Sequence, residues 1–149
     1  MLKRLLVFLI GFSLMTFASA QGQVELYVIV NANNSLDSLS ADQLERLFLL
    51  KTKRFENGES AEPVNQSEGS KARELFNEKV LQRNEQQLKY YWSRKMFSGS
   101  DKPPPIAVSN SDTETFVSEH PGGVGYLTRQ PQSDQVKVVL TVKRQAGGR

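Results

Sequence analysis

The spacing of hydrophobic residues changes several times along the chain, which predicts short strands alternating with helices. Residues 24–30 are apolar, rich in β-branched side chains and too few for a helix, so we interpret them as a buried first strand. Similar short runs predict strands near 63–64, 106–108, 124–127 and 136–142. This alternation predicts a single α/β domain, a sandwich with a mixed sheet flanked by helices.

Capping residues predict where the helices begin. Capping-box patterns occur at three places: Ser40 with Gln43, Asn84 with Gln87, and Ser111 with Glu114. Another helix is predicted to begin at Ser67 or Ser70, and the first is predicted to end near Leu50. Apolar residues at helical spacing define the inner faces: Leu44, Leu47 and Phe48; Ala72, Leu75, Phe76 and Val80; Leu88, Tyr91, Trp92 and Met96; and Phe116 with Val117.

The third of these faces contains two neighbouring aromatic side chains. Tyr91 and Trp92 share it with Leu88 and Met96, and helical periodicity is enough to explain their spacing. We therefore interpret Trp92 as a core residue. A platform on which a ligand stacks is the alternative interpretation.

The first twenty residues have the pattern of a secretory signal peptide. Lys3 and Arg4 precede an apolar run at 5–17, which is too short for a membrane span, and Ala18-Ser19-Ala20 is a small-residue cleavage site. We expect residues 1–20 to be removed, leaving Gln21 first and no stable membrane anchor. The expected division is then a domain over 21–142 and a flexible tail over 143–149.

Composition excludes several classes of function. The 149 residues contain no cysteine and one histidine, and the sequence has no Walker, dinucleotide-binding or Gly-x-Ser-x-Gly pattern. Loss of Lys3 and Arg4 lowers the net charge from +3 to +1, which removes the electrostatic argument for nucleic-acid binding. We expect no enzyme activity, no cofactor and no metal, with His120 a solvated turn residue rather than a metal ligand.

A candidate anion-binding segment lies at the start of the second helix. It contains Gln66, Ser67, Glu68, Gly69, Ser70 and Lys71. Free N–H groups and the positive end of the helix dipole bind anions at such positions. The two serines can donate hydroxyls, Gly69 permits close approach, and Lys71 or Arg73 can add charge. A plain helix cap without any ligand remains the alternative.

Motifs from about Asn31 to Val139 resemble the periplasmic phosphate-binding proteins of ABC importers. Residues 47–51 (LFLLK) are similar to that family's Ile-Phe-Leu-Gly-Lys, and 121–126 (PGGVGY) to its Pro-Gly-Ala-Ile-Gly-Tyr. Residues 66–72 (QSEGSKA) match the family's anion-binding stretch Arg-Ser-Asp-Gly-Ser-Gly-Thr. The resemblance implies a periplasmic protein with one lobe of a type II periplasmic-binding-protein-like sandwich, the second of the family's two lobes.

The candidate segment departs from the family at three ligand positions. The family's Arg, Asp and Thr are here Gln66, Glu68 and Ala72, whereas Ser70 is kept. Loss of the arginine removes a bidentate, permanently charged partner for an oxyanion. The resemblance therefore implies a solute-binding-like protein that binds phosphate or a related oxyanion weakly, in association with an ABC permease or envelope protein. The alternative is an interaction or sensor-partner module of the cell envelope that has lost tight ligand binding.

Overall fold

The computed structural model describes residues 23–144. The predicted signal peptide at 1–20 lies outside the described residues, as do positions 145–149 of the predicted tail. Within the part that is described, no helix combines the length and the apolarity that a membrane span needs.

Four strands form the main sheet, in the order β2-β5-β1-β6. The central strand β1 (Val24–Asn31) runs antiparallel to both β5 (Gly123–Leu127) and β6 (Val136–Lys143). At the edge, β2 (Glu62–Pro63) runs parallel to β5. The predicted mixed sheet is therefore confirmed.

A second, smaller sheet pairs two short parallel strands, β3 (Asn65–Gln66) and β4 (Ile106–Ala107). Each is followed by a short connection and a helix, α2 (Lys71–Phe76) after β3 and α4 (Asn110–Glu119) after β4. Parallel pairing places the carboxyl ends of β3 and β4 at the same edge.

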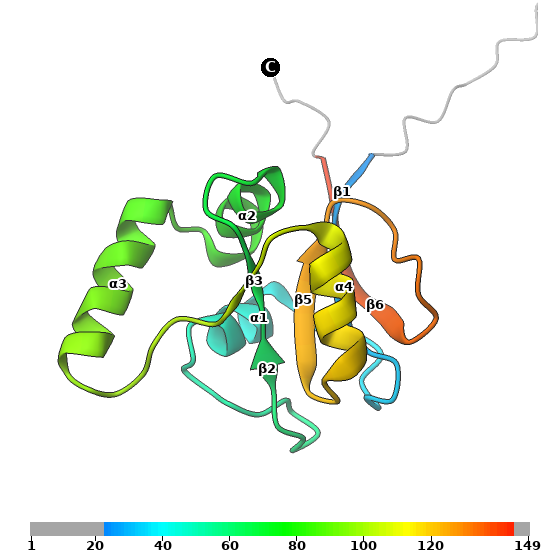
Figure 1. The fold of residues 1–149 in the computed structure, drawn as a ribbon, viewed down its shortest axis with the longest axis horizontal. Helices are drawn as coiled ribbons and strands as arrows, with labels where there is room; N and C mark the ends of the chain where they lie inside the picture. Colours follow the sequence, from blue (N-terminus) through cyan, green and yellow to red (C-terminus); the bar gives the residue numbers. More distant parts are fainter. Residues whose placement is uncertain (1–22, 145–149) are drawn as a thin grey trace, which may run out of the picture.

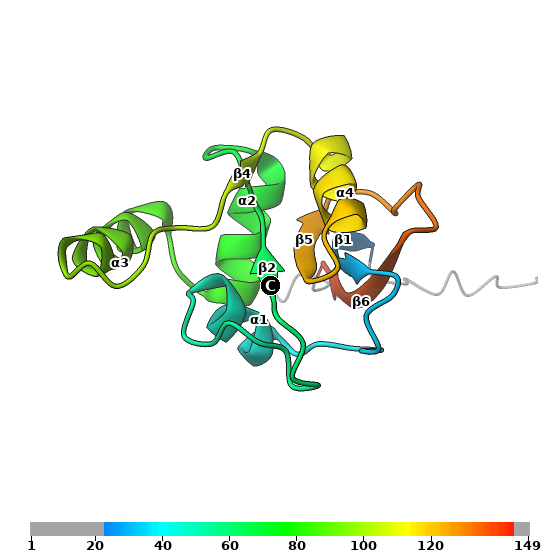
Figure 2. The same ribbon diagram turned by 60° about the horizontal axis from the view of Figure 1, so that its bottom comes forward.

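Helices cover both faces of the main sheet (Figure 2). Successive residues of β1 point to opposite faces: Val28 contributes to a core with α1 (Ala41–Phe48), α2 and the π-helical turn η1 (Asn77–Leu81), and Ile29 to one with α4. The first core contains a chain of aromatic rings, in which Phe76 lies between Phe48 and Tyr126. The domain is thus a three-layer α/β sandwich.

Helix α3 (Glu85–Phe97) lies at one end of the molecule and projects from it (Figures 1 and 2). Leu88 and Trp92 are its buried residues, and the Tyr91 hydroxyl donates a hydrogen bond of 2.6 Å to the carbonyl of Leu49. The interpretation of Trp92 as a core residue is confirmed. The expectation for Met96 is wrong: the last turn of the helix extends beyond the core, so this side chain is 52% exposed.

Two of the three predicted capping boxes are confirmed, those of Ser40 with Gln43 and Asn84 with Gln87. The third is wrong, because α4 is capped by Ser109, whose side chain accepts from the N–H of Asp112. Glu114 turns inward instead of back toward Ser111, and it binds a loop that lies later in the chain. Val117 is buried as expected, whereas Phe116 is only partly buried.

Candidate functional site

The candidate segment lies at the edge where β3 and β4 end. In Figure 1 the turn before α2 and the start of α4 both lie at the upper edge of the molecule. The structure thereby places two short connections beside each other, 67–70 after β3 and 108–109 after β4. Ligands of open α/β folds commonly bind at the carboxyl ends of strands.

The turn itself is built by Ser67, Gly69 and Ser70. The N–H of Ser70 donates to the carbonyl of Ser67 at 3.0 Å, and its hydroxyl accepts from the N–H of Arg73 at 3.2 Å. Gly69 has φ +81°, a conformation that glycine adopts without strain. Within residues 23–144, the backbone N–H groups of Gly69, Lys71 and Ala72 donate to no acceptor.

Gln66, in contrast, is buried and faces inward. Its side-chain nitrogen donates to the carbonyl of Tyr126 at 2.8 Å and to Oδ1 of Asn110 at 3.0 Å. The Asn110 side chain continues this network to the hydroxyl of Thr128 at 2.8 Å. Gln66 thus connects β3 to β5 and to the start of α4, and both of its amide hydrogens are already used.

The buried Tyr126 side chain forms hydrogen bonds with both residues of β3. Its hydroxyl accepts from the N–H of Gln66 at 3.0 Å and donates to the side chain of Asn65 at 3.1 Å. Burial raises the pKa of this phenol to about 12, so it remains a neutral hydrogen-bonding group at physiological pH. The ring stacks on Phe76 at 4.1 Å, which fixes the strand end relative to the core.

The arginine nearest to the turn is already paired. Arg73 forms two hydrogen bonds with the Glu85 carboxylate, one from Nε at 3.1 Å, and also donates to the carbonyl of Gln66 at 3.1 Å. The Asn77 side chain donates to the same carboxylate at 2.9 Å. Because this bidentate pair balances the guanidinium charge with the Glu85 carboxylate, little of that charge is left to attract an anion at the turn.

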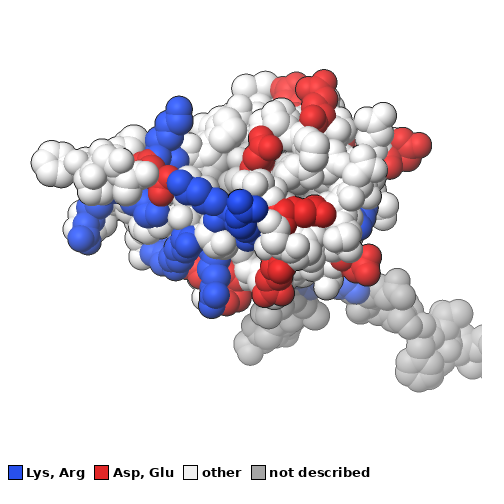
Figure 3. Space-filling model, turned by 90° about the horizontal axis from the view of Figure 1, so that it is seen from below, with Lys and Arg blue, Asp and Glu red and all other residues white. Residues whose placement is uncertain are grey.

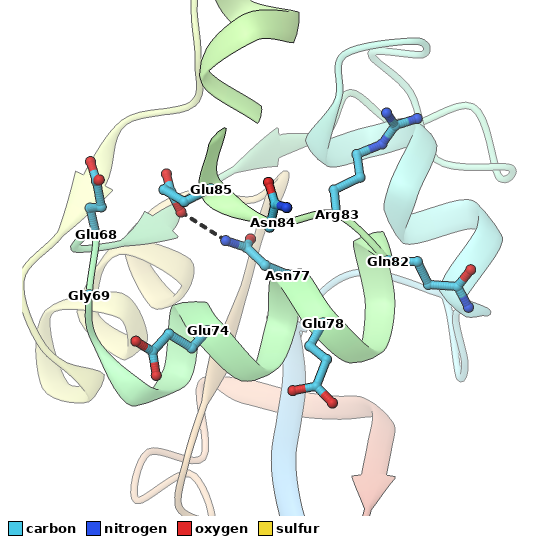
Figure 4. Close-up of a pocket in the computed structure, with 9 residues that line it drawn as sticks. All are labelled: Glu68, Gly69, Glu74, Asn77, Glu78, Gln82, Arg83, Asn84 and Glu85. Atoms are coloured by element: carbon cyan, nitrogen blue, oxygen red, sulfur yellow. Dashed lines mark hydrogen bonds between the residues drawn. The ribbon is translucent and has the colours of Figure 1, made fainter. Parts of the chain in front are cut away.

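An acidic pocket of about 640 Å³ adjoins the turn (Figure 4). Its lining includes four glutamates, Glu68, Glu74, Glu78 and Glu85, and a single arginine, Arg83. The hydrogen bond from Lys89 lowers the pKa of the Glu68 carboxyl, which therefore stays charged at neutral pH. Three of these glutamates are paired with Lys or Arg side chains, and Arg83 contacts Glu45, so the lining offers an anion no unpaired positive charge. The favourable geometry is therefore confined to the backbone of the turn.

The structure thus brings five of the six sequence-predicted residues, 67–71, into one exposed turn and buries Gln66 beneath it. Sequence reasoning missed Asn110 and Thr128, which line the same edge through the Gln66 network. A signal was present: residues 106–110 repeat the order of a short strand, a serine and a helix start. If two such strands pair in parallel, the connections that follow them lie at the same edge of the sheet.

His120 is separate from this edge. It ends α4, its ring stacks on Phe116 at 3.9 Å, and its Nδ1 lies 2.7 Å from the Phe116 carbonyl oxygen. Among residues 23–144, no group of three or more His, Asp or Glu side chains is arranged to hold a metal ion.

No protein-family model matches the sequence, and no curated protein matches it. Solved structures do. A protein from Clostridium perfringens, solved with bound phosphate and assigned as a phosphate ABC transporter substrate-binding protein, is 16% identical with a TM-score of 0.61. That match covers 79% of this chain and 45% of the other.

Two further solved structures have a similar fold. An ABC-type phosphate transport receptor from Vibrio cholerae is 16% identical with a TM-score of 0.53, over 78% of this chain and 45% of that one. PstS from Borrelia burgdorferi is 9% identical with a TM-score of 0.53, over 71% and 41%. The chain spans less than half the length of each. It therefore has the α/β fold found in one part of phosphate ABC transporter substrate-binding proteins.

Proposed function

We propose that this protein is a periplasmic solute-binding-like protein, without enzyme activity, that binds phosphate or a related oxyanion weakly at residues 66–71. We further propose that it works in association with ABC-type phosphate transport. One observation carries the proposal: the N–H groups of Gly69, Lys71 and Ala72, at an edge formed by strand ends, meet no acceptor in the described chain. Such groups, together with the Ser67 and Ser70 hydroxyls, suit an oxyanion.

Three features make the proposed binding weak. Gln66 stands where the phosphate-binding family has an arginine, and its side chain is already hydrogen-bonded inside the protein. The Arg73 charge is paired with Glu85. Glu68 adds a negative charge to the turn, only partly offset by Lys89 at 2.7 Å. We therefore expect affinity in the millimolar range, about 4 kcal/mol of binding free energy.

The test is a titration of inorganic phosphate and sulfate into isotope-labelled protein, following the amide NMR signals of the turn. Saturable shifts at Gly69, Lys71 and Ala72 would support the proposal. Glu68→Gln should tighten binding about fivefold, because it removes a charge worth about 1 kcal/mol at 4 Å in water. Gly69→Ala should weaken it, whereas Gly58→Ala, at a turn with a similar positive φ of 85°, should leave it unchanged.

Absence of shifts at the turn up to about 10 mM of either anion would contradict the proposal. The interaction-module function would then replace it. One observation favours that alternative: Ile106 and Val108, at the same edge, are 55% and 75% exposed. Apolar side chains in this position suit a protein partner of the cell envelope. Cross-linking from position 108 in intact cells would identify that partner.

A further inference from the structure

We propose that the outer face of α3, defined by Tyr90, Arg94 and Phe97, docks on an anionic phospholipid surface. These three residues lie at i, i+4 and i+7, so they share one side of the helix. Leu88 and Trp92, which bind the helix to the core, lie on the opposite side. This inference does not depend on the proposed oxyanion binding.

Large apolar side chains on the outer part of α3 are exposed to solvent. Phe97 is 98% exposed and Tyr90 66%, and Met96, which follows Trp92 by one turn at the free end of the helix, is 52% exposed. Of the five large apolar side chains that are exposed within residues 23–144, these three belong to α3. Burial of a phenylalanine side chain is among the larger single contributions available to an interface.

Positive charge accompanies these side chains. A surface groove of about 780 Å³ runs along α3 and is lined by Arg83, Arg94 and Lys95 together with Tyr90 and Tyr91, and its lining contains no carboxylate. Arg94 forms no ion pair with any described residue, and its guanidinium lies 5.8 Å from the centre of the Tyr90 ring. Its charge is therefore available to an external partner.

Each of the two carboxylates at the margin of the groove contacts two basic side chains. Glu45 contacts both Lys51 and Arg83, at 2.9 and 3.4 Å. Asp101 similarly contacts Lys53 and Lys95, at 2.7 and 3.6 Å. Figure 3 shows the Lys and Arg side chains gathered at the end of the molecule that carries α3, whereas most Asp and Glu side chains of that view lie elsewhere. Charge complementarity thus calls for an anionic partner.

The shape of this region favours a membrane over a small anion or a folded protein. A small ligand in the groove would leave Phe97 uncovered, because this side chain lies outside the groove lining, on a helix that projects from the domain (Figures 1 and 2). A protein partner would need a hollow matched to Phe97 and Met96, whereas a fluid bilayer accepts such side chains without a preformed shape. Basic residues close to an anionic lipid surface each add about 1 kcal/mol of attraction.

The experiment measures vesicle co-sedimentation of the exported protein, with its N-terminus determined by intact mass so that every variant has the same one. Vesicles of phosphatidylcholine and phosphatidylglycerol in equal parts should bind the protein, and vesicles of phosphatidylcholine alone should bind it much less. Arg94→Gln should lower the partition coefficient about fivefold, and Phe97→Ser about tenfold. Lys143→Gln, on the exposed part of β6, should change it by less than twofold.

Conservative variants separate a bilayer from a protein partner. Arg94→Lys and Phe97→Leu keep the charge and the apolar surface, so vesicle binding should remain within about twofold of wild type. The proposal is wrong if vesicles containing phosphatidylglycerol bind no more protein than neutral ones, or if Arg94→Gln and Phe97→Ser bind as wild type does. Loss of cross-links to an envelope protein in Phe97→Leu, without any vesicle binding, would identify the face as a protein interface instead.

Discussion

Glu114 is a carboxylate inside the protein, and its contacts explain why it is charged there. Burial opposes its ionisation, but the Arg129 guanidinium at 2.7 Å and the N–H groups of Ser133 and Gln132 outweigh that effect and lower the pKa of the carboxyl. Gln132 donates at 2.6 Å. Through these contacts one side chain of α4 holds the connection between β5 and β6 in place.

We predict that Glu114→Gln lowers the free energy of unfolding by about 1.5 to 3 kcal/mol at neutral pH, because it weakens charged hydrogen bonds in a buried position. Urea denaturation measures the difference. Glu119→Gln, an exposed change on the same helix, should have an effect within about 0.5 kcal/mol.

The same pair of proteins gives a pH prediction. The pKa of Glu114 lies below its ordinary value of 4.5 in the folded state, so its contribution to stability is present above that pH and is lost as the pH falls through the folded-state pKa. The stability difference between wild type and Glu114→Gln should therefore shrink in acid. A difference that is constant from pH 7 to pH 3 would contradict this assignment.

At the scale of elements, α3 depends on few side chains for its position. Trp92 is buried and meets the Tyr91 ring edge-on at 5.0 Å. We predict that Trp92→Ala costs about 3 to 5 kcal/mol in unfolding free energy. Tyr90→Ala, on the opposite face, should cost little. Normal melting of Trp92→Ala would contradict the predicted cost.

The contact between α4 and β5 depends on a glycine. A Cβ atom on Gly123 would lie 2.8 Å from the Cα of Val117, which is backbone and cannot rotate away. We predict that Gly123→Ala destabilises the protein by about 1 to 3 kcal/mol through overpacking. An unchanged melting temperature of Gly123→Ala would contradict the prediction.

Elements whose signals are local could be predicted from the sequence. The caps of α1 and α3 depend on residues three positions apart, so the pattern contains both partners. Glu114 shows where this fails, because its partners Arg129, Gln132 and Ser133 belong to a loop that no local pattern connects to α4. The π-helical turn after α2 likewise has no local signal that we recognise.

At the scale of the whole molecule, export is the prediction that the sequence makes most directly. Lys3 and Arg4, the apolar run 5–17 and the small residues before Gln21 occur together. We predict that the mature protein begins at Gln21, which intact-mass measurement of the periplasmic fraction tests. A protein that retains residues 1–20 and sediments with membranes would contradict export and cleavage together.

The candidate site shows a similar division between local and global information. Ser67, Gly69 and Ser70 could be recognised because a turn before a helix has its own composition. The inward orientation of Gln66 could not, since its partners Tyr126 and Asn110 lie 60 and 44 positions away. The resemblance predicts a ligand position at 66, and the structure shows that the Gln66 side chain also forms hydrogen bonds inside the protein.

The central position of β1 determines when this protein can fold. The first strand pairs with the last two, and Arg144 reaches Glu25 across 119 positions of sequence. Closing so large a loop has to precede the gain from those contacts, which makes folding slow relative to a protein of local contacts. A chain emerging from the ribosome N-terminus first cannot complete its main sheet until β6 has been made. The cores on both faces of that sheet therefore stay incomplete until nearly the whole chain has been synthesised.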